Sequence, residues 1–260
     1  MLQKISTLKG LTVSAIDGDI GSVFDVYFDA QQWTVRYFVV DTGTWLSSRR
    51  VLISPMSLRP AEVDGNRVSV ELSRTQVEQA PSWDVDLPVS RQHEIAHAQY
   101  YDHPYYWTGP ARWGLGWDPM IGPMPDPRPD PVEEEILARE RESVDTNLHS
   151  ARNVLGYYLQ ATDDDVGHVD DFLADDRTWA IRYIVVDTRN WLPGRKVVIS
   201  PDWIKSVSWG DSRVYVDLTR REVETAPQYD PNVPLKRSIE SRLYEHYRRP
   251  AYWDDEPKRH

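Results

Sequence analysis

Two stretches of the chain share one pattern of apolar and polar positions. Residues 33–42 and 179–188 each alternate between apolar and polar residues, become fully apolar, and end in an Asp-Thr pair. This pattern predicts a β-strand that begins half exposed and ends in a hydrophobic core. We expect the rest of the chain to form two units, one around each of these strands.

The two strands belong to a longer repeat. When the sequence is shifted by 146 positions, residues 10–107 align with residues 156–253 without a gap, and about 40 of the 98 pairs are identical. Two copies are too few for a solenoid, so the sequence indicates a duplicated domain. The two copies can mimic a homodimer within one chain.

Each copy reads as several short strands followed by helices. In the first copy, alternating residues and turn dipeptides predict strands near 8–15, 20–29, 33–42, 49–54 and 67–72. Capping boxes at 73–76 and 219–222 each predict a short helix, and second helices are expected over about 90–101 and 235–248. We therefore predict a mainly β fold of two duplicated small β-barrels with peripheral helices.

The segment between the copies has a different composition. Residues 108–131 are rich in Pro, Gly and Trp, and residues 132–142 read as a charged surface helix with acids at its start. We predict three parts: a first barrel with a C-terminal helix over 1–107, a linker over 108–149, and a second barrel with a C-terminal helix over 150–260.

The turn glycines and apolar strands of both copies resemble the PRC-barrel family. The resembling residues are 9–10, 17–21, 36–42 and 50–55 in the first copy, and 155–156, 163–171, 182–188 and 196–201 in the second. The family includes the cytoplasmic domain of the photosynthetic reaction-centre H subunit and the C-terminal domain of the ribosome-maturation factor. The resemblance implies a β-barrel used as a docking or assembly module, and it brings no catalytic residue.

Composition and charge narrow the function classes. The net charge is −11 and the sequence pI is about 5.1, so long-range electrostatics argue against a nucleic-acid partner. The chain has no cysteine, which excludes disulfides, thiolate catalysis and cysteine-bound metals. It has no apolar run near the roughly 20 residues that span a bilayer, and residues 1–6 lack the apolar stretch of a secretory signal. We expect a soluble cytoplasmic protein without direct membrane insertion.

One short motif carries candidate chemistry. His93-Glu94-Ile95-Ala96-His97 matches the H-E-x-x-H pattern of zinc metalloproteases, in which the two histidines bind the ion and the Glu acts as base. His103 lies where metzincins place a third ligand, but Tyr100 occupies the glycine position of that pattern. The second copy lacks the histidine pair. We favour ordinary polar helix positions with no cofactor and no metal; a zinc or nickel site is the alternative.

Acidic residues cluster in the first hairpin of each copy. They are Asp17 and Asp19 in the first copy, and Asp163, Asp164, Asp165, Asp170, Asp171, Asp175 and Asp176 in the second. The D-x-D-x-G pattern hints at calcium, but the bidentate Glu of an EF-hand loop is missing. We favour solvated hairpin turns, and a weak cation site is the alternative.

Aromatic residues are the last candidates. They crowd the end of the first copy and the linker, and such residues beside proline are typical of contact surfaces, although they can also cover the barrels. Trp45 and Trp191 occupy matching loops, and each is followed by an arginine. The interface candidates are Trp45, Arg49, Trp113, Trp117, Trp191 and Arg195.

These patterns together predict a non-enzymatic interaction or assembly protein built from two PRC-like barrels. We expect a protein partner, whose identity the sequence does not give, and self-association as a homodimer. The alternatives are a metal-dependent hydrolase that uses His93, Glu94 and His97, an RNA-processing accessory protein, and a factor related to photosynthetic complexes.

Overall fold

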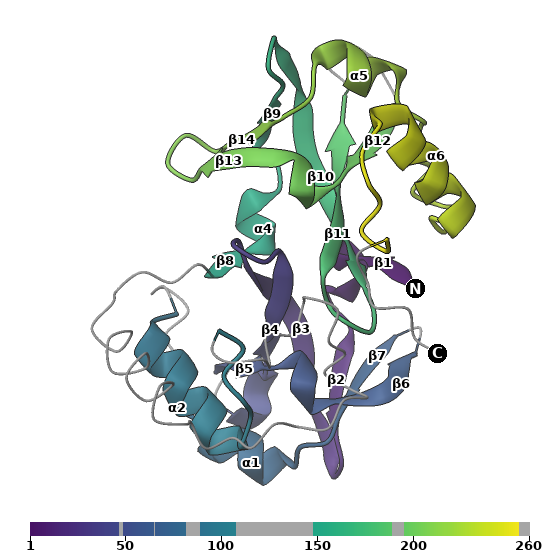
Figure 1. Ribbon diagram of the computed structural model, residues 1–260. Helices are drawn as coiled ribbons and strands as arrows, with labels where there is room; N and C mark the ends of the chain where they lie inside the picture. The colour runs from purple at the N-terminus through teal and green to yellow at the C-terminus, as the bar shows by residue number, and fades with distance from the viewer. Residues whose placement is uncertain (47–48, 65, 82–88, 108–147, 189–194, 255–260) are drawn as a thin grey trace. The chain divides into compact units, whose positions relative to one another are not determined.

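The computed structural model describes residues 1–46, 49–64, 66–81, 89–107, 148–188 and 195–254 (Figure 1). The chain divides into two compact units, and each contains one seven-stranded sheet. Unit 1 comprises residues 1–6, 151–176 and 181–260, and unit 2 comprises residues 7–150 and 177–180. The predicted mainly β fold with two duplicated domains is confirmed.

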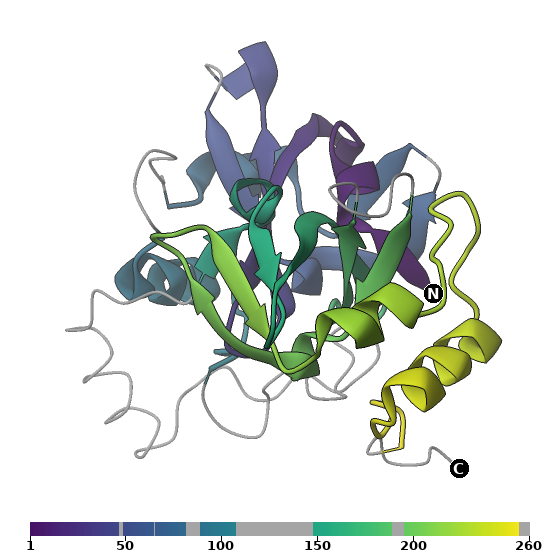
Figure 2. The same ribbon diagram turned by 90° about the horizontal axis from the view of Figure 1, so that it is seen from above.

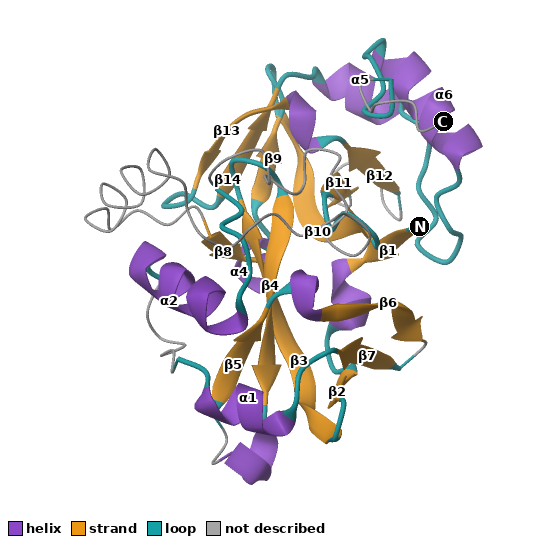
Figure 3. Cartoon of the chain, turned by 60° about the horizontal axis from the view of Figure 1, so that its bottom comes forward, coloured by secondary structure: helices purple, strands orange, loops and turns teal. Residues whose placement is uncertain are grey.

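The sheet of unit 2 has the strand order β5-β4-β3-β2-β7-β6, and β8 pairs with β3 outside this path. Its strands are β2 (Thr12–Ala15), β3 (Gly18–Asp29), β4 (Thr34–Asp41), β5 (Arg50–Ile53), β6 (Leu58–Asp64), β7 (Arg67–Val70) and β8 (Leu148–Ser150). Its helical segments are η2 (Gly43–Leu46), η3 (Pro55–Ser57), α1 (Arg74–Gln79) and α2 (Arg91–Tyr101). Figure 3 shows β5, β4, β3 and β2 side by side, with α1 near their ends.

The sheet of unit 1 has the corresponding order β12-β11-β10-β9-β14-β13, and β1 pairs with β10 outside this path. Its strands are β1 (Leu2–Lys4), β9 (Tyr158–Gln160), β10 (Asp165–Asp175), β11 (Ile181–Asp187), β12 (Lys196–Ile199), β13 (Ile204–Ser208) and β14 (Arg213–Val216). Its helical segments are α4 (Ala151–Val154), η4 (Pro201–Trp203), α5 (Arg220–Thr225) and α6 (Arg237–Tyr247). Figure 2 shows α5 in green and α6 in yellow beside these strands.

The compact units do not follow the boundaries predicted from the sequence. Those boundaries, 1–107, 108–149 and 150–260, follow the repeat, whereas β1 from the start of the chain pairs with β10 in unit 1. In the same way β8 pairs with β3 in unit 2, so the segment predicted as a linker ends in a strand. The 3-10 helix η1 (Ile5–Leu8) carries the chain from one unit to the other. The predicted charged helix over 132–142 lies outside the described residues.

The helix signals in the sequence are confirmed. Ser73 and Thr219 each cap a short helix, and each forms the predicted capping box with the residue three positions later. Ser90 caps α2 by accepting a hydrogen bond from the main chain of His93. In the part of the chain that the structure describes, no helix is long and apolar enough to cross a membrane.

Strand β4, which forms from the first of the two stretches with the shared apolar pattern, differs from its prediction in one respect. The half-exposed start is wrong, because β4 is buried from Thr34 to Val40 and the polar residue Arg36 is fully buried. In β11 the equivalent Arg182 is partly exposed. A guanidinium sealed inside a sheet needs partners, and those partners define the site described below.

Two glycines allow neighbouring strands to approach closely. A Cβ atom on Gly21 in β3 would lie 2.0 Å from the carbonyl oxygen of Asp41, and one on Gly167 in β10 would lie 2.2 Å from that of Asp187. Real Cβ atoms do not come this near to a carbonyl oxygen. Gly167 also has a φ of +136°, which side chains with a Cβ rarely adopt. The shared glycine in each repeat is therefore required by backbone contact.

We predict that Gly21→Ala and Gly167→Ala each lower the free energy of unfolding by about 3 kcal/mol or more, because backbone must move to admit the methyl group. Urea unfolding of the full chain measures this. Gly210→Ala is the control, because a Cβ there meets nothing within 4 Å. Alanine variants at 21 or 167 that match the control would contradict the role of close approach.

Candidate functional site

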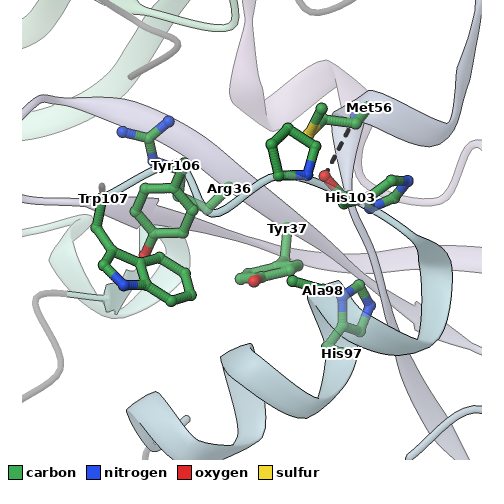
Figure 4. Close-up of a pocket in the computed structure, with 10 residues that line it drawn as sticks. Arg36, Tyr37, Met56, His97, Ala98, His103, Tyr106 and Trp107 are labelled. Atoms are coloured by element: carbon green, nitrogen blue, oxygen red, sulfur yellow. Dashed lines mark hydrogen bonds between the residues drawn. The ribbon is translucent and has the colours of Figure 1, made fainter. Parts of the chain in front are cut away.

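Helix α2 places the predicted motif residues against the sheet of unit 2. It begins after the cap Ser90 and ends at Asp102, which adopts the left-handed conformation with φ of 56°. The imidazole Nε2 of His97 lies 3.0 Å from the main-chain oxygen of Leu52 in β5, which fixes the helix over this strand. Figure 4 shows His97, Ala98 and His103 from this part of the chain beside Tyr37 of β4.

Glu94 lies in a closed network of polar side chains. It is 1% exposed, accepts a hydrogen bond from Arg91 Nη1 at 2.8 Å, and accepts another from the hydroxyl of Tyr106 at 2.6 Å. Burial raises the pKa of Glu94 to about 7, although Arg91 and the Tyr106 hydroxyl act in the opposite direction. Both carboxylate oxygens therefore have partners from the protein itself.

His97 and His103 are buried and neutral. A carbonyl oxygen only accepts hydrogen bonds, so the Nε2 of His97 is the protonated nitrogen that donates to Leu52. The ring of His97 packs edge-on to Tyr37, with centroids 5.1 Å apart. Burial lowers the pKa of His97 to about 3 and that of His103 to about 4. His103 Nε2 lies 3.4 Å from the hydroxyl of Ser57.

The metalloprotease arrangement is not formed by these residues. Glu94 turns toward Arg91 and Tyr106, while His97 turns toward β5, and the rings of His97 and His103 are 6.5 Å apart between centroids. His93 is half buried, and burial lowers its pKa. Among the described residues, no group of three or more His, Asp or Glu side chains is placed to hold a metal ion. The geometry thus gives the hydrolase alternative no support.

The buried guanidinium of Arg36 extends the network, and sequence reasoning missed it. Arg36 donates to Gln32 Oε1 at 2.6 Å and to Asp29 Oδ2 at 3.3 Å. Its guanidinium carbon also lies 3.9 Å from the ring centroid of Tyr106. On the helix side, Arg91 lies 4.1 Å above the ring of Trp107. Cation–π contacts of this kind are strongest when desolvated, so they fix the segment after α2 onto β4.

The same network is present in unit 1 at equivalent positions. Glu240 is 3% exposed and accepts hydrogen bonds from the hydroxyls of Tyr183 at 2.9 Å and Tyr252 at 3.0 Å. Arg182 lies 4.1 Å from the ring centroid of Tyr252, and Arg237 lies 4.0 Å from that of Trp253. The signal in the sequence was the identity of these positions between the copies, because Arg36, Tyr37, Arg91, Glu94, Tyr106 and Trp107 are all repeated 146 residues later.

The units differ beside this network. Unit 2 has a small hollow lined in part by His97, His103 and Trp107, with room for about one water molecule (Figure 4). In unit 1 the position of His97 is taken by Leu243, and Trp203 packs on Tyr247 with ring centroids 4.6 Å apart. Large apolar side chains thus lie in unit 1 where unit 2 carries buried polar groups.

Four of the acidic residues at the hairpin turns have partners from their own repeat. Asp17 and Asp163 each accept a hydrogen bond from the first main-chain N–H of a short helix, at 2.8 Å and 2.7 Å respectively. Asp19 pairs with Arg67 and Asp165 pairs with Arg213, both at 2.9 Å. These contacts favour the interpretation as hairpin turns that also cap helices.

The predicted interface residues that the structure describes make contacts within their own repeat. The indole N–H of Trp45 donates to the carbonyl of Ile20, and Arg74 lies 4.4 Å above its ring. Arg49 donates to the carbonyl of Ala80 at 2.7 Å, and Arg195 donates to the equivalent carbonyl of Ala226. A role in an interface stays a prediction for these three residues. Trp113, Trp117 and Trp191 lie outside the described residues.

We predict that Glu94→Gln changes how stability depends on pH. The pKa of Glu94 rises on folding from 4.5 to about 7, so its stabilising effect is complete below pH 4.5 and is lost as the pH rises through 7. The difference in unfolding free energy, wild type minus Glu94→Gln, should fall by roughly 2–3 kcal/mol between pH 5 and pH 8. Urea unfolding at several pH values measures it. The control Tyr106→Phe keeps the carboxyl group and should retain the dependence, whereas parallel profiles for wild type and Glu94→Gln would contradict the prediction.

We predict the opposite sign for His97→Leu, which installs the residue of the second repeat. The pKa of His97 falls on folding from 6.5 to about 3, so its stabilising effect is present above pH 6.5 and is lost at lower pH. The difference in unfolding free energy, wild type minus His97→Leu, should fall by about 2 kcal/mol between pH 7 and pH 5. A difference that stays constant over this range would show that His97 is not held neutral by the fold.

The comparisons with known proteins identify the domain in both repeats. A sequence model of the PRC-barrel domain matches residues 3–74 and 147–223, which together make up more than half of the chain. A search of curated proteins finds no match. Each match runs from the residues of β1 or β8 to those of α1 or α5, so the network residues on α2 and α6 lie beyond it. The chain therefore belongs to the PRC-barrel family and contains the domain twice.

Proposed function

We propose that this protein is a non-enzymatic interaction module, in which two PRC barrels present surfaces to a protein partner. The observation that carries the proposal is a row of exposed and half-exposed side chains across unit 1. Tyr158 of β9 is 44% exposed and lies between His168 of β10 and Arg213 of β14. Tyrosine and arginine are enriched in protein interfaces, where they supply contact area with few rotatable bonds.

The sheet itself holds this row in place. His168 pairs with Tyr158 across the antiparallel strands, and Arg213 pairs with Tyr158 across the parallel strands. The rings of Tyr158 and His168 have centroids 4.5 Å apart, and the guanidinium of Arg213 lies 5.3 Å from the tyrosine ring. A row fixed by strand register loses little conformational entropy on binding, which favours affinity.

The two repeats differ in this row. The equivalent positions in unit 2 are Thr12, Ser22 and Arg67, which pair in the same register. Both repeats thus keep the arginine with its aspartate partner, while the aromatic side chains occur only in unit 1. Positions that both repeats share fit a role in the fold, and an exposed difference between them fits a role in recognition.

The burial of the candidate catalytic groups supports a non-enzymatic role. Glu94, His97 and His103 are buried against partners from the protein, and the neighbouring hollow has room for about one water molecule. Among the described residues, that hollow leaves no space for a substrate beside them. The cytoplasmic location, the homodimer, and the alternatives in RNA processing or photosynthetic complexes stay predictions, and no described contact favours one of them.

We predict that Tyr158→Thr, which installs the residue of the first repeat, removes binding to the partner. Tagged full-length protein should be used for affinity capture from cells of the native host, with mass spectrometry of the captured proteins. Recovery of the partner should fall tenfold or more, which corresponds to about 1.4 kcal/mol. Because Tyr158 is exposed, urea unfolding should change by no more than about 0.5 kcal/mol.

Thr12→Ala is the matched control, because it changes the same strand position in the other repeat. It should recover the partner as well as wild type does. If Tyr158→Thr captures the same proteins in the same amounts as wild type, then this row is not the recognition surface. If no protein is enriched by wild type over an untagged control, then the proposal of an interaction module fails as a whole.

A further inference from the structure

The two repeats donate strands to one another's units in the same register. Repeat one means residues 1–107 here, and repeat two means residues 147–253. In unit 1, Leu2, Gln3 and Lys4 of β1 pair with Asp175, Ala174 and Leu173 of repeat two. In unit 2, Leu148, His149 and Ser150 of β8 pair with Asp29, Phe28 and Tyr27 of repeat one. Every pair in the second set lies at the positions equivalent to the first, so the exchange is reciprocal.

Each acceptor strand carries a buried carboxylate that binds a serine of the donated segment. Asp171 accepts hydrogen bonds from the main-chain N–H of Ser6 at 3.1 Å and from its hydroxyl. Asp25, the equivalent residue, accepts a hydrogen bond from the hydroxyl of Ser150 at 2.6 Å. The two aspartates are 5% and 7% exposed. Hydrogen bonds to a charged group that is sealed from water are among the stronger ones in proteins.

Apolar side chains of the donated segments are also buried. Ile5 in unit 1 is 6% exposed and Leu148 in unit 2 is 9% exposed, and Leu148 belongs to a core cluster with Tyr37, Val39 and Leu52 of repeat one. The chain passes from one unit to the other within these short segments, at residues 6–7 and 150–151. Separation of a donated strand would therefore expose apolar surface as well as an open strand edge.

A third segment of the chain also belongs to the unit built from the other repeat. Residues 177–180 of repeat two belong to unit 2, where the main-chain N–H of Val35 donates to the carbonyl of Trp179 at 2.9 Å. Trp179 is fully buried, and its ring packs edge-on to Phe38 with centroids 4.9 Å apart. Thr34 bridges to Ala180, which is the residue 146 positions later. Unit 2 thus contains two separate pieces of repeat two.

We propose that the edges of β3 and β10 are the surfaces through which one PRC repeat of this type binds another. The partner is a second copy of the repeat that offers its own N-terminal strand, and the two halves of this chain form such a pair. The covalent connection through residues 108–147 is not needed for the pairing. This inference concerns the pairing of repeats and does not rest on the proposed binding of another protein.

Cleavage of the connection tests the proposal on the full chain. A specific protease site is inserted after residue 125, the purified protein is cut to completion, and the product is analysed by size-exclusion chromatography with light scattering. We expect the two fragments to elute together at the mass of the intact chain. Fragments of cut wild type that elute separately at micromolar concentration would overturn the proposal.

A pair of variants tests whether the donated strands are responsible. Gln3 and His149, the middle residues of β1 and β8, are both replaced by proline, which removes the N–H and the strand conformation, or both by alanine as the matched control. After cleavage, the dissociation constant between the fragments should rise at least about 100-fold for the proline variant relative to the alanine variant, equal to about 2.7 kcal/mol. Equal constants would overturn the proposal.

Hydrogen exchange on cut wild type provides a test that needs no variant. Main-chain amides of β1 and β8 should be as protected in the cut complex as in the uncut chain. They should lose that protection when dilution separates the fragments. A cut complex that stays together while these amides exchange freely would show that other contacts hold the halves, and the proposal would then fail.

Discussion

A carboxyl group that is buried away from water needs hydrogen-bond partners or an opposite charge beside it. This requirement ties a helix to the sheet in both units. Glu94 and Glu240 are each nearly inaccessible. Glu94 accepts a hydrogen bond from the hydroxyl of Tyr106, and Glu240 accepts hydrogen bonds from those of Tyr183 and Tyr252. Loss of one partner would leave a buried polar group unsatisfied, which is more costly than the hydrogen bond is favourable. The orientation of α2 follows from this network, and the burial of His97 against β5 follows from that orientation.

The elements that the sequence predicted well are those that local patterns encode. The capping boxes and the alternating strands depend on neighbours within a few residues, and they occur where expected. The donated strands β1 and β8 have only three residues each, and their partners lie more than 100 positions away. No periodic pattern can arise over three residues, so these strands were not predictable from one sequence. For the same reason the sequence did not show which segments make up each compact unit.

The candidate site shows the same difference between local patterns, which the sequence reveals, and contacts between distant residues, which it does not. The motif of His93 and His97 is a pattern of spacing, and spacing does not say that Glu94 turns toward Tyr106. Burial of Arg36 contradicted the expectation that a polar residue in an alternating strand faces water. A comparison of the repeats position by position would have found the network, because its members are identical. It would also have pointed to Tyr158 and His168, because Thr12 and Ser22 stand at the equivalent positions of the first repeat.

The exchanged strands also set the order in which this protein can fold during synthesis. Strand β1 leaves the ribosome about 170 residues before its partner in β10, a delay of roughly 10–30 s at ordinary rates of translation. Unit 2 likewise waits for β8 and then for Trp179. Unit 2 cannot be finished as the first repeat emerges, so the edge of β3 stays open on the nascent chain until the second repeat arrives, while β1 stays unpaired until β10 is made. Open strand edges of this kind are sites of mispairing between chains. For this protein, the risk of such mispairing is greatest during synthesis on crowded polysomes.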